Sequence, residues 1–187
     1  MGWITLLSIL VVVAILAAAV IVVALYNRLV TLRNRVDNAW AQIDVQLRRR
    51  YDLIPNLVAT VKGYAAHERE TLENVVRARA AAMGVTDLEQ RSAAENELSA
   101  TLKSLFAVAE AYPDLKANQS FLDLQNQLAD TEGKIAYARQ FFNDSVMSYN
   151  MAMQQFPANL VAATFGFEER VYFEIEASAK EPVSVSF

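Results

Sequence analysis

The feature that most constrains the fold of this chain is an uncharged segment over residues 3–25, in which an unbroken apolar run extends from Ile9 to Leu25. As an α-helix this segment rises roughly 35 Å, enough to cross a bilayer hydrocarbon core of about 30 Å. A helix also satisfies its own backbone polar groups, as lipid requires. We therefore predict a single-pass transmembrane anchor over residues 1–25, whose apolar side chains include Trp3, Leu6, Ile9, Leu16 and Leu25.

Two alternatives to an uncleaved anchor stay open. Ala17, Ala18 and Ala19 supply the small residues of a signal-peptide cleavage site, and the segment could instead be a buried core helix. Against the signal peptide, no Lys or Arg precedes the run, and the run is longer than an ordinary signal-peptide core.

Basic residues predict the orientation of the anchor. Arg28, Arg33 and Arg35 follow the apolar segment closely, whereas the residues before it carry no positive charge. Because Lys and Arg accumulate on the cytoplasmic side of membrane spans, we expect a cytoplasmic C-terminal domain and an N-terminus outside.

Composition narrows the function classes. The formal net charge is only −4, which argues against nucleic acid as the main partner. Cysteine is absent, so disulfides and thiolate chemistry are excluded.

A carboxylate-bridged metal pair in a helical bundle needs two Glu-x-x-His motifs, and His67 is the only histidine. There is no Gly-x-Ser-x-Gly elbow, and we predict no cofactor, no metal site and no enzymatic activity.

Beyond the anchor, apolar residues recur every three or four positions from Leu29 to Leu47, which predicts a helix with one apolar face. The basic cluster Arg48–Arg50 suits the end of a helix, and Asp52 can cap a new one. We therefore expect the chain to reverse near Tyr51 and Asp52. The alternative is one kinked helix that continues through Pro55.

Three further helices are predicted. The first runs from about residue 54 to 83 and ends at Gly84; the second begins after Thr86 or Asp87 and ends at Tyr112–Pro113; the third spans residues 114–156. Short breaks between amphipathic helices predict an all-α, antiparallel four-helix bundle over residues 26–157. For residues 158–187 we expect a partly ordered, extended tail, with strand-like alternation over residues 183–187.

A polar row interrupts the apolar face of the last predicted helix, with Asn118, Gln125, Glu132 and Arg139 spaced seven residues apart. We interpret it as a structural polar layer that fixes helix register by pairing with polar groups on the first or second helix. A ligand or proton site and plain exposure to solvent are the alternatives.

The tail carries an aromatic group. We predict that Phe165, Phe167, Tyr172 and Phe173 contact the membrane surface or a neighbouring copy of the chain, because aromatic side chains suit such interfaces. Alternatively, these side chains fold back on their own bundle.

Several motifs resemble the LemA family. They are Arg33–Trp40, Arg49–Val58, Val61–Tyr64, Ala111–Asn118 and the pairs Ala138-Arg139, Tyr149-Asn150 and Phe156-Pro157, so the resemblance covers nearly the whole chain. It implies a bacterial membrane-anchored four-helix bundle without an established enzymatic activity. The family is associated with envelope stress, with a membrane zinc metalloprotease and with remodelling of internal membranes in magnetic bacteria.

Three functions follow as hypotheses. The first is an inner-membrane scaffold that forms homo-oligomers or docks partners, with membrane lipid as a further partner. The second is an adaptor or regulator of a membrane protein such as a metalloprotease. The third, which we favour least, is an enzyme or metal protein.

Overall fold

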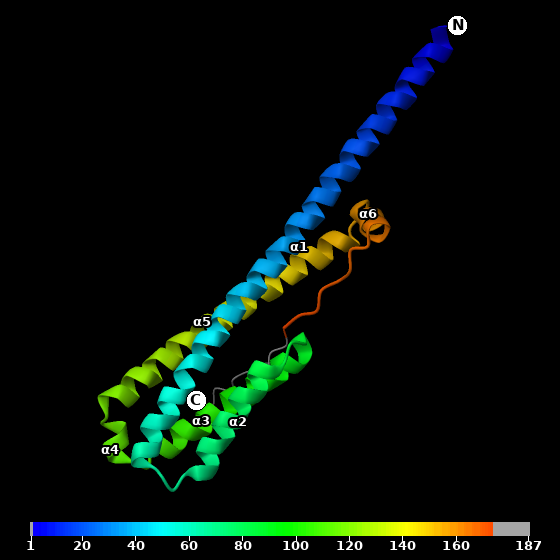
Figure 1. Ribbon diagram of the computed structural model, residues 1–187. Helices are drawn as coiled ribbons and strands as arrows, with labels where there is room; N and C mark the ends of the chain where they lie inside the picture. Colours follow the sequence, from blue (N-terminus) through cyan, green and yellow to red (C-terminus); the bar gives the residue numbers. More distant parts are fainter. Residues whose placement is uncertain (1, 174–187) are drawn as a thin grey trace, which may run out of the picture. The chain divides into compact units, whose positions relative to one another are not determined.

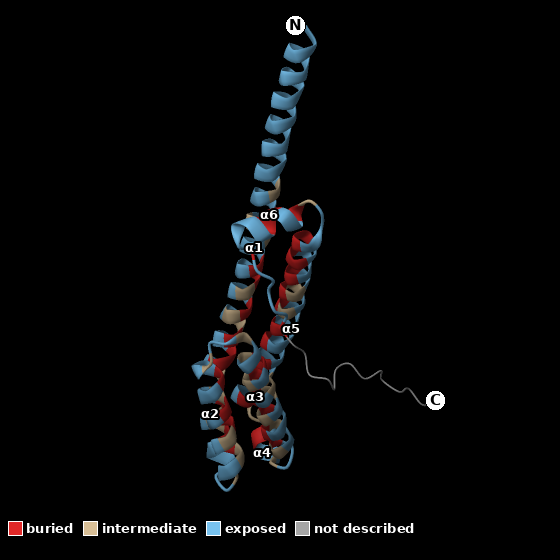
Figure 2. Ribbon diagram, turned by 90° about the vertical axis from the view of Figure 1, so that its right-hand side faces the viewer, coloured by how far each residue is buried: buried red, intermediate tan, exposed pale blue. Residues whose placement is uncertain are grey.

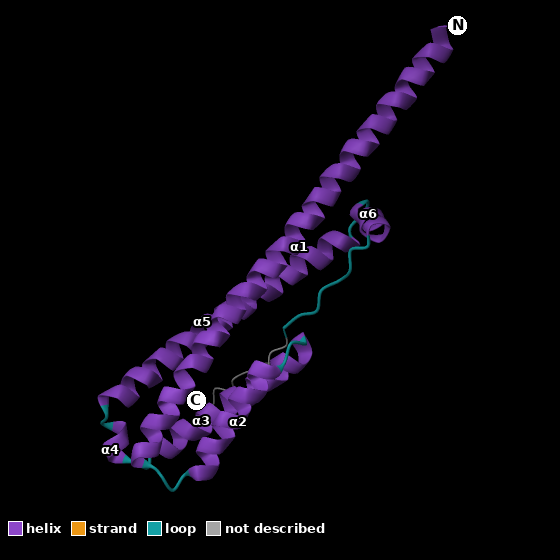
Figure 3. Cartoon of the chain, in the orientation of Figure 1, coloured by secondary structure: helices purple, strands orange, loops and turns teal. Residues whose placement is uncertain are grey.

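The computed structural model describes residues 2–173 and is all-α over that range (Figure 1, Figure 3). No strand occurs among these residues. In chain order the helices are α1 (Gly2–Tyr64), α2 (Arg69–Gly84), α3 (Leu88–Ala109), α4 (Pro113–Lys116), α5 (Gln119–Gln154) and α6 (Ala158–Phe165).

The chain divides into two compact units. Among the described residues, the first unit comprises residues 2–40 and 141–171, and the second unit comprises residues 41–140 together with 172 and 173. The helices α1 and α5 each contribute residues to both units.

In the first unit, the N-terminal part of α1 has no packing partner. Residues 2–24 are exposed along the whole circumference of the helix (Figure 2). Among the described helices, α1 alone is long and apolar enough to cross a membrane. Farther along α1, Leu29, Val36 and Ala39 are buried, and Trp40 lies 5.7 Å from the ring of Phe142 on α5.

The predicted reversal near Tyr51 and Asp52 is wrong, because α1 continues through Pro55 to Tyr64. Proline has no backbone N–H, so the Tyr51 carbonyl four residues earlier loses its helical partner. Arg79 of α2 supplies a replacement, since its Nε donates to the Tyr51 oxygen at 2.7 Å. A side chain from the neighbouring helix thus compensates for the interior proline.

The turn between α1 and α2 lies at residues 65–68, later than predicted. The next two helix boundaries lie where the sequence predicts them. The helix α2 ends at Gly84, and Asp87 caps α3, with its carboxylate accepting from the Gln90 N–H at 3.1 Å.

The last long helix begins later than predicted. Pro113 opens α4, which is only a short helix, and a second start follows at Asn118. The Asn118 Oδ1 accepts from the Phe121 N–H at 3.0 Å, which is the bond of an N-cap residue. Asn118 therefore belongs to a helix start, whereas the predicted continuous helix placed it in the interior.

The second unit has an apolar core to which every one of its long helical segments contributes. Its almost completely buried apolar side chains include Ile43, Leu47, Ile54, Leu57, Val75, Leu98, Leu105, Leu115, Ile135 and Phe173. The helices α2 and α3 pack against each other and are joined by the short turn at residues 85–87.

The expectation that the tail is extended is wrong for its first residues, which form α6. This helix ends at Gly166, whose φ of 68° is left-handed, and the Phe167 N–H donates to the Ala162 oxygen at 3.0 Å. The predicted strand-like segment at residues 183–187 lies outside the described residues.

Candidate functional site

The second unit contains a network of charged side chains centred on Arg50. The Arg50 side chain is fully buried, and its terminal nitrogens donate to three acceptors on two other helices. One nitrogen donates to the Ser99 hydroxyl at 2.9 Å and to Glu132 Oε2 at 2.7 Å, and the other donates to Glu95. Arg50 thereby connects α1 with α3 and α5 through charge-assisted hydrogen bonds.

Glu95 is also fully buried and has a second donor, the Tyr51 hydroxyl. Burial raises the pKa of Tyr51 well above its ordinary value of 10.0, and the hydrogen bond to the negative Glu95 raises it further. Tyr51 therefore stays protonated at neutral pH and donates to Glu95.

The charges of Arg50 and Glu95 balance inside the core, whereas Glu132 remains 47% exposed. Transfer of charges out of water is costly, so a buried pair of this kind is tolerated only when its hydrogen bonds are made. The arrangement connects α1 with α3. The Ser99 hydroxyl also donates to Glu132 Oε1 at 3.3 Å. Within residues 2–173 no group of three or more His, Cys, Asp or Glu side chains is placed to hold a metal ion.

A cavity of about 240 Å³ adjoins the network. Arg50, Ser99 and Glu132 form its polar wall, and Gln125 also contributes. The apolar wall consists of Leu102, Phe106, Leu128 and Ala129, with Lys103 completing the lining. Both terminal nitrogens of Arg50 already have acceptors, and Lys103 is the other cation in the lining.

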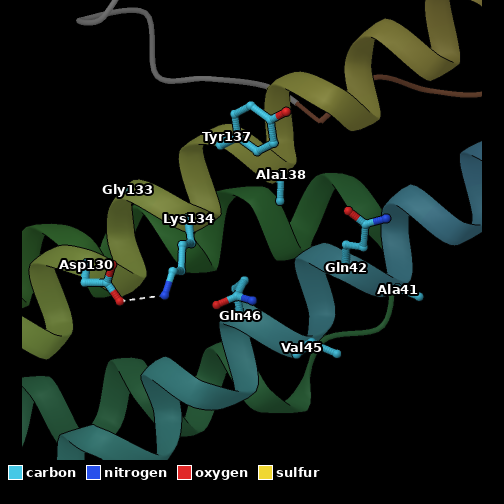
Figure 4. A pocket seen from close by; sticks show the side chains of 9 residues that line it. All are labelled: Ala41, Gln42, Val45, Gln46, Asp130, Gly133, Lys134, Tyr137 and Ala138. Atoms are coloured by element: carbon cyan, nitrogen blue, oxygen red, sulfur yellow. Dashed lines mark hydrogen bonds and ion pairs between the residues drawn. The ribbon is translucent and has the colours of Figure 1, made fainter.

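A larger, open groove of about 740 Å³ lies between α1 and α5 within the second unit (Figure 4). Residues of α1 form one side and residues of α5 form the other: Ala41, Gln42, Val45 and Gln46, then Asp130, Gly133, Lys134, Tyr137 and Ala138. Tyr137 is 73% exposed, and Val45 is exposed too. Lys134 and Asp130 form an ion pair of 2.8 Å on the α5 side.

One residue of the lining has a polar atom without a hydrogen bond. The Oε1 atom of Gln46 is buried and accepts from no donor among the described residues. A buried acceptor without a donor costs free energy, and because this atom is closed off from solvent, it is not offered to a molecule in the open groove.

The polar row predicted along α5 does not come together as one cluster. Glu132 pairs with Arg50, and Gln125 lines the cavity beside it. Asn118 caps α5 and donates to the Tyr64 hydroxyl at 2.9 Å, while the Arg139 guanidinium lies 4.7 Å from the ring centroid of Phe173.

The aromatic residues of the tail have different surroundings. Phe167 and Phe173 are buried, whereas Phe165 and Tyr172 are exposed. For the two buried rings, the alternative that the tail folds back on the protein describes the structure better than exposure to a membrane or a partner.

Sequence reasoning missed Arg50, Tyr51 and Glu95. The available signal was spacing, because Arg50 lies on the same helical face as Leu47 and Ile54, and Glu95 lies on the face of Leu98 and Leu102. A charged residue at a core position of each of two helices predicts a pair, but only if α1 is known to continue past residue 50.

Comparison with known proteins agrees with the resemblance seen in the motifs. The family model for the LemA family matches residues 39–187. Magnetosome protein MamQ of Magnetospirillum gryphiswaldense is 24% identical, covering 84% of this chain and 68% of the relative. Magnetosome protein MamQ 2 of Paramagnetospirillum magneticum is also 24% identical, with the same shares covered.

A third relative, Protein LemA of Metamycoplasma hominis, is 26% identical over 85% of this chain and 72% of the relative. None of these names states a reaction. Together with the long apolar N-terminal helix, they indicate a membrane-associated helical protein. Since the family model covers most of its length, this chain belongs to the LemA family.

Proposed function

We propose that this protein is a membrane-anchored scaffold, which self-assembles at the bacterial inner membrane and influences membrane organisation or envelope stress. The observation that carries the proposal is the open groove between α1 and α5 in the second unit, with its exposed Tyr137 and Val45 side chains. Exposed apolar hollows of this kind are typical of interaction sites.

The occupant that the groove fits best is a second copy of the chain. Tyr137 stands at the groove itself, so a two-fold arrangement would let each copy place its Tyr137 against the other copy's groove. Tyrosine is enriched at interfaces because it combines apolar area with a hydroxyl donor.

We further propose that the second unit is an antiparallel four-helix bundle made of residues 41–64, α2, α3 and residues 119–140. The hydrogen bond from Arg79 of α2 to the Tyr51 carbonyl and the Arg50 bonds to α3 and α5 support this arrangement. A rigid bundle would present the groove in one fixed geometry.

For location, we propose that residues 3–25 cross the inner membrane once and that the rest of the chain is cytoplasmic. The positive charges of Arg28, Arg33 and Arg35 support this orientation. Sequence similarity to magnetosome proteins supports a role in membrane organisation.

The alternative function is an adaptor or regulator of a membrane protein such as a metalloprotease. The same groove supports it, because an open surface with polar and apolar lining can also receive a segment of a different protein. The two functions differ in what occupies the groove.

Site-specific photocrosslinking in native membranes tests this proposal. A benzophenone amino acid replaces Tyr137, and the matched control carries it at Met83, an exposed apolar position on α2. We expect a crosslinked dimer of the chain from position 137 only. A crosslink to one other membrane protein would favour the adaptor, and equal or no crosslinking at the two positions would contradict both.

A further inference from the structure

The C-terminal end of the first unit contains a long uncharged stretch. Between Asp144 and Glu168 the chain has no Asp, Glu, Lys or Arg, a length comparable with the uncharged N-terminal segment that ends before Arg28. The end of α5 and the whole of α6 lie within it. A water-exposed helical end would ordinarily carry charges, so the absence of them calls for an explanation.

The helix α6 has a buried face and an exposed apolar face. Ala158, Val161 and Ala162 are buried against the protein. On the outside, Leu160 is 59% exposed, Phe165 is 53% exposed, and Phe156 just before the helix is 80% exposed. The largest apolar side chains of this element therefore point away from the protein.

Ring contacts place this exposed face beside the end of the anchor. Tyr26 immediately follows the apolar segment, and its ring lies 5.0 Å from Phe165 and 5.6 Å from Phe167. Figure 1 shows α6 next to α1 at the end of α5, and Figure 2 shows the same from the side. Since residues 3–25 fill the bilayer core, Tyr26 falls at the boundary between lipid and water, and α6 falls with it.

Hydrogen bonds hold the segment that directly follows α6. The side-chain amide of Asn150 on α5 pairs with both backbone groups of Arg170, at 2.9 and 3.0 Å. The Tyr149 hydroxyl donates to the Glu168 oxygen at 3.0 Å, and Arg170 forms a 3.2 Å ion pair with Asp37 of α1. These bonds to α5 and α1, together with the buried face of α6, limit the directions in which its apolar face can point.

We propose that α6 is a second membrane contact, lying in the headgroup region of the bilayer with Phe156, Leu160 and Phe165 inserted among the lipids. Short apolar and aromatic surfaces bind at this depth, where aromatic residues and neighbouring basic residues are enriched. Arg33, whose guanidinium lies 5.4 Å from the centroid of the Phe167 ring, and Arg28 supply the positive charges on the adjacent turns of α1. The proposal rests on residues 3–25 crossing the membrane and is independent of the groove.

Spin-label depth measurement tests the proposal on the full-length chain in vesicles of phosphatidylethanolamine and phosphatidylglycerol. The chain has no cysteine, so single cysteines at Leu160 and Phe165 can each be labelled with a nitroxide without removing native thiols. Val13 in the anchor serves as the deep reference, and Asp144, an exposed residue on α5, serves as the water reference. Circular dichroism confirms that each variant keeps the parent's helix content.

We expect labels at positions 160 and 165 to collide several-fold less with an aqueous nickel chelate than the label at 144, and more with dissolved oxygen. If the label at position 13 is inaccessible to the nickel chelate while the labels at 160 and 165 are as accessible as the label at 144, residues 3–25 cross the membrane but α6 does not contact it, and this proposal fails. Spin–spin broadening at 165 that disappears on dilution with unlabelled protein would also overturn it, since α6 would then contact another copy.

Discussion

At the scale of single residues, the protein places a full ion pair inside its core. Arg50 and Glu95 are both completely buried, and each forms hydrogen bonds to neighbours on other helices, although Arg50 Nε has no partner among the described residues. A buried pair contributes little net stability compared with apolar residues of the same size, but removal of one member leaves a charge without a partner. We therefore predict that the pair acts mainly by specifying one helix register.

The ion pair gives a direct prediction. Glu95→Ala in the full-length, detergent-solubilised protein should lower the free energy of unfolding by about 3–5 kcal/mol, because Arg50 is left buried and unpaired. Glu132→Ala should cost only about 1 kcal/mol, since that carboxylate is half exposed and screened by solvent. Urea unfolding followed by circular dichroism measures both.

Glu97→Ala, at an exposed position on the same helix, is the control and should change the stability by less than about 0.5 kcal/mol. Equal effects at positions 95 and 97 would show that the charge network is not structural.

Tyr51 makes stability depend on alkaline pH. Its pKa in the folded protein is raised, so on unfolding the phenol becomes more acidic and ionises from about pH 10 upward. The unfolded state then binds fewer protons than the folded state, and the contribution of Tyr51 to stability is present below pH 10 and lost above it.

We expect the unfolding free energy of the parent to fall more steeply between pH 10 and 11 than that of Tyr51→Phe, by up to about 1.4 kcal/mol per pH unit. Tyr149, whose pKa is also raised by burial, is present in both proteins and cancels in the comparison. Parallel pH profiles would contradict the assigned burial of Tyr51.

At the scale of elements, the apolar spacing predicted most helices but not every boundary between them. The faces from Leu29 to Leu47 and from Phe121 to Met153 are buried, and the cap at Asp87 is where its chemistry predicts. Pro55 misled the prediction because the compensating donor, Arg79, comes from another helix and leaves no local signal. The helix starts at Asn118 and at α6 were also missed. Each is marked only by a few local residues, and the prediction followed the longer apolar periodicity instead.

The continuity of α1 depends on the bond from Arg79 to the Tyr51 carbonyl. Arg79→Ala should cost about 1.5–3 kcal/mol, the usual value for a hydrogen bond that involves a charged group. Pro55→Ala restores a backbone N–H that can bond the same carbonyl. In that background the cost of Arg79→Ala should fall markedly, and urea unfolding of the four proteins measures the coupling. The same cost in both backgrounds would mean that Arg79 contributes by packing alone.

At the scale of the whole molecule, the sequence predicted the all-α class, which the structure confirms over residues 2–173, and the LemA family, which the family model confirms. The predicted anchor agrees with the long apolar start of α1. The groove could not be predicted, because it depends on which turns of α1 and α5 lie side by side. The Arg50 network shares this dependence. Both are properties of helix pairs, whereas periodicity describes one helix at a time.

The orientation of the chain gives a prediction at this scale. Because Arg28, Arg33 and Arg35 follow the apolar segment, protease added to intact spheroplasts should leave residues 26–187 uncut. Lysis of the spheroplasts should expose the same residues to digestion and serves as the control. Digestion from the outside would reverse the proposed topology.

The measurement that tests the scaffold most directly is native mass spectrometry of the full-length protein released from lipid nanodiscs. We predict that the parent is a homo-oligomer and that Tyr137→Asp, which places a charge at the groove, shifts it to monomer. Met83→Asp, the same charge at an exposed apolar position on α2, should leave the oligomer intact. A monomeric parent, or an oligomer that Tyr137→Asp leaves unchanged, would contradict self-assembly through the groove.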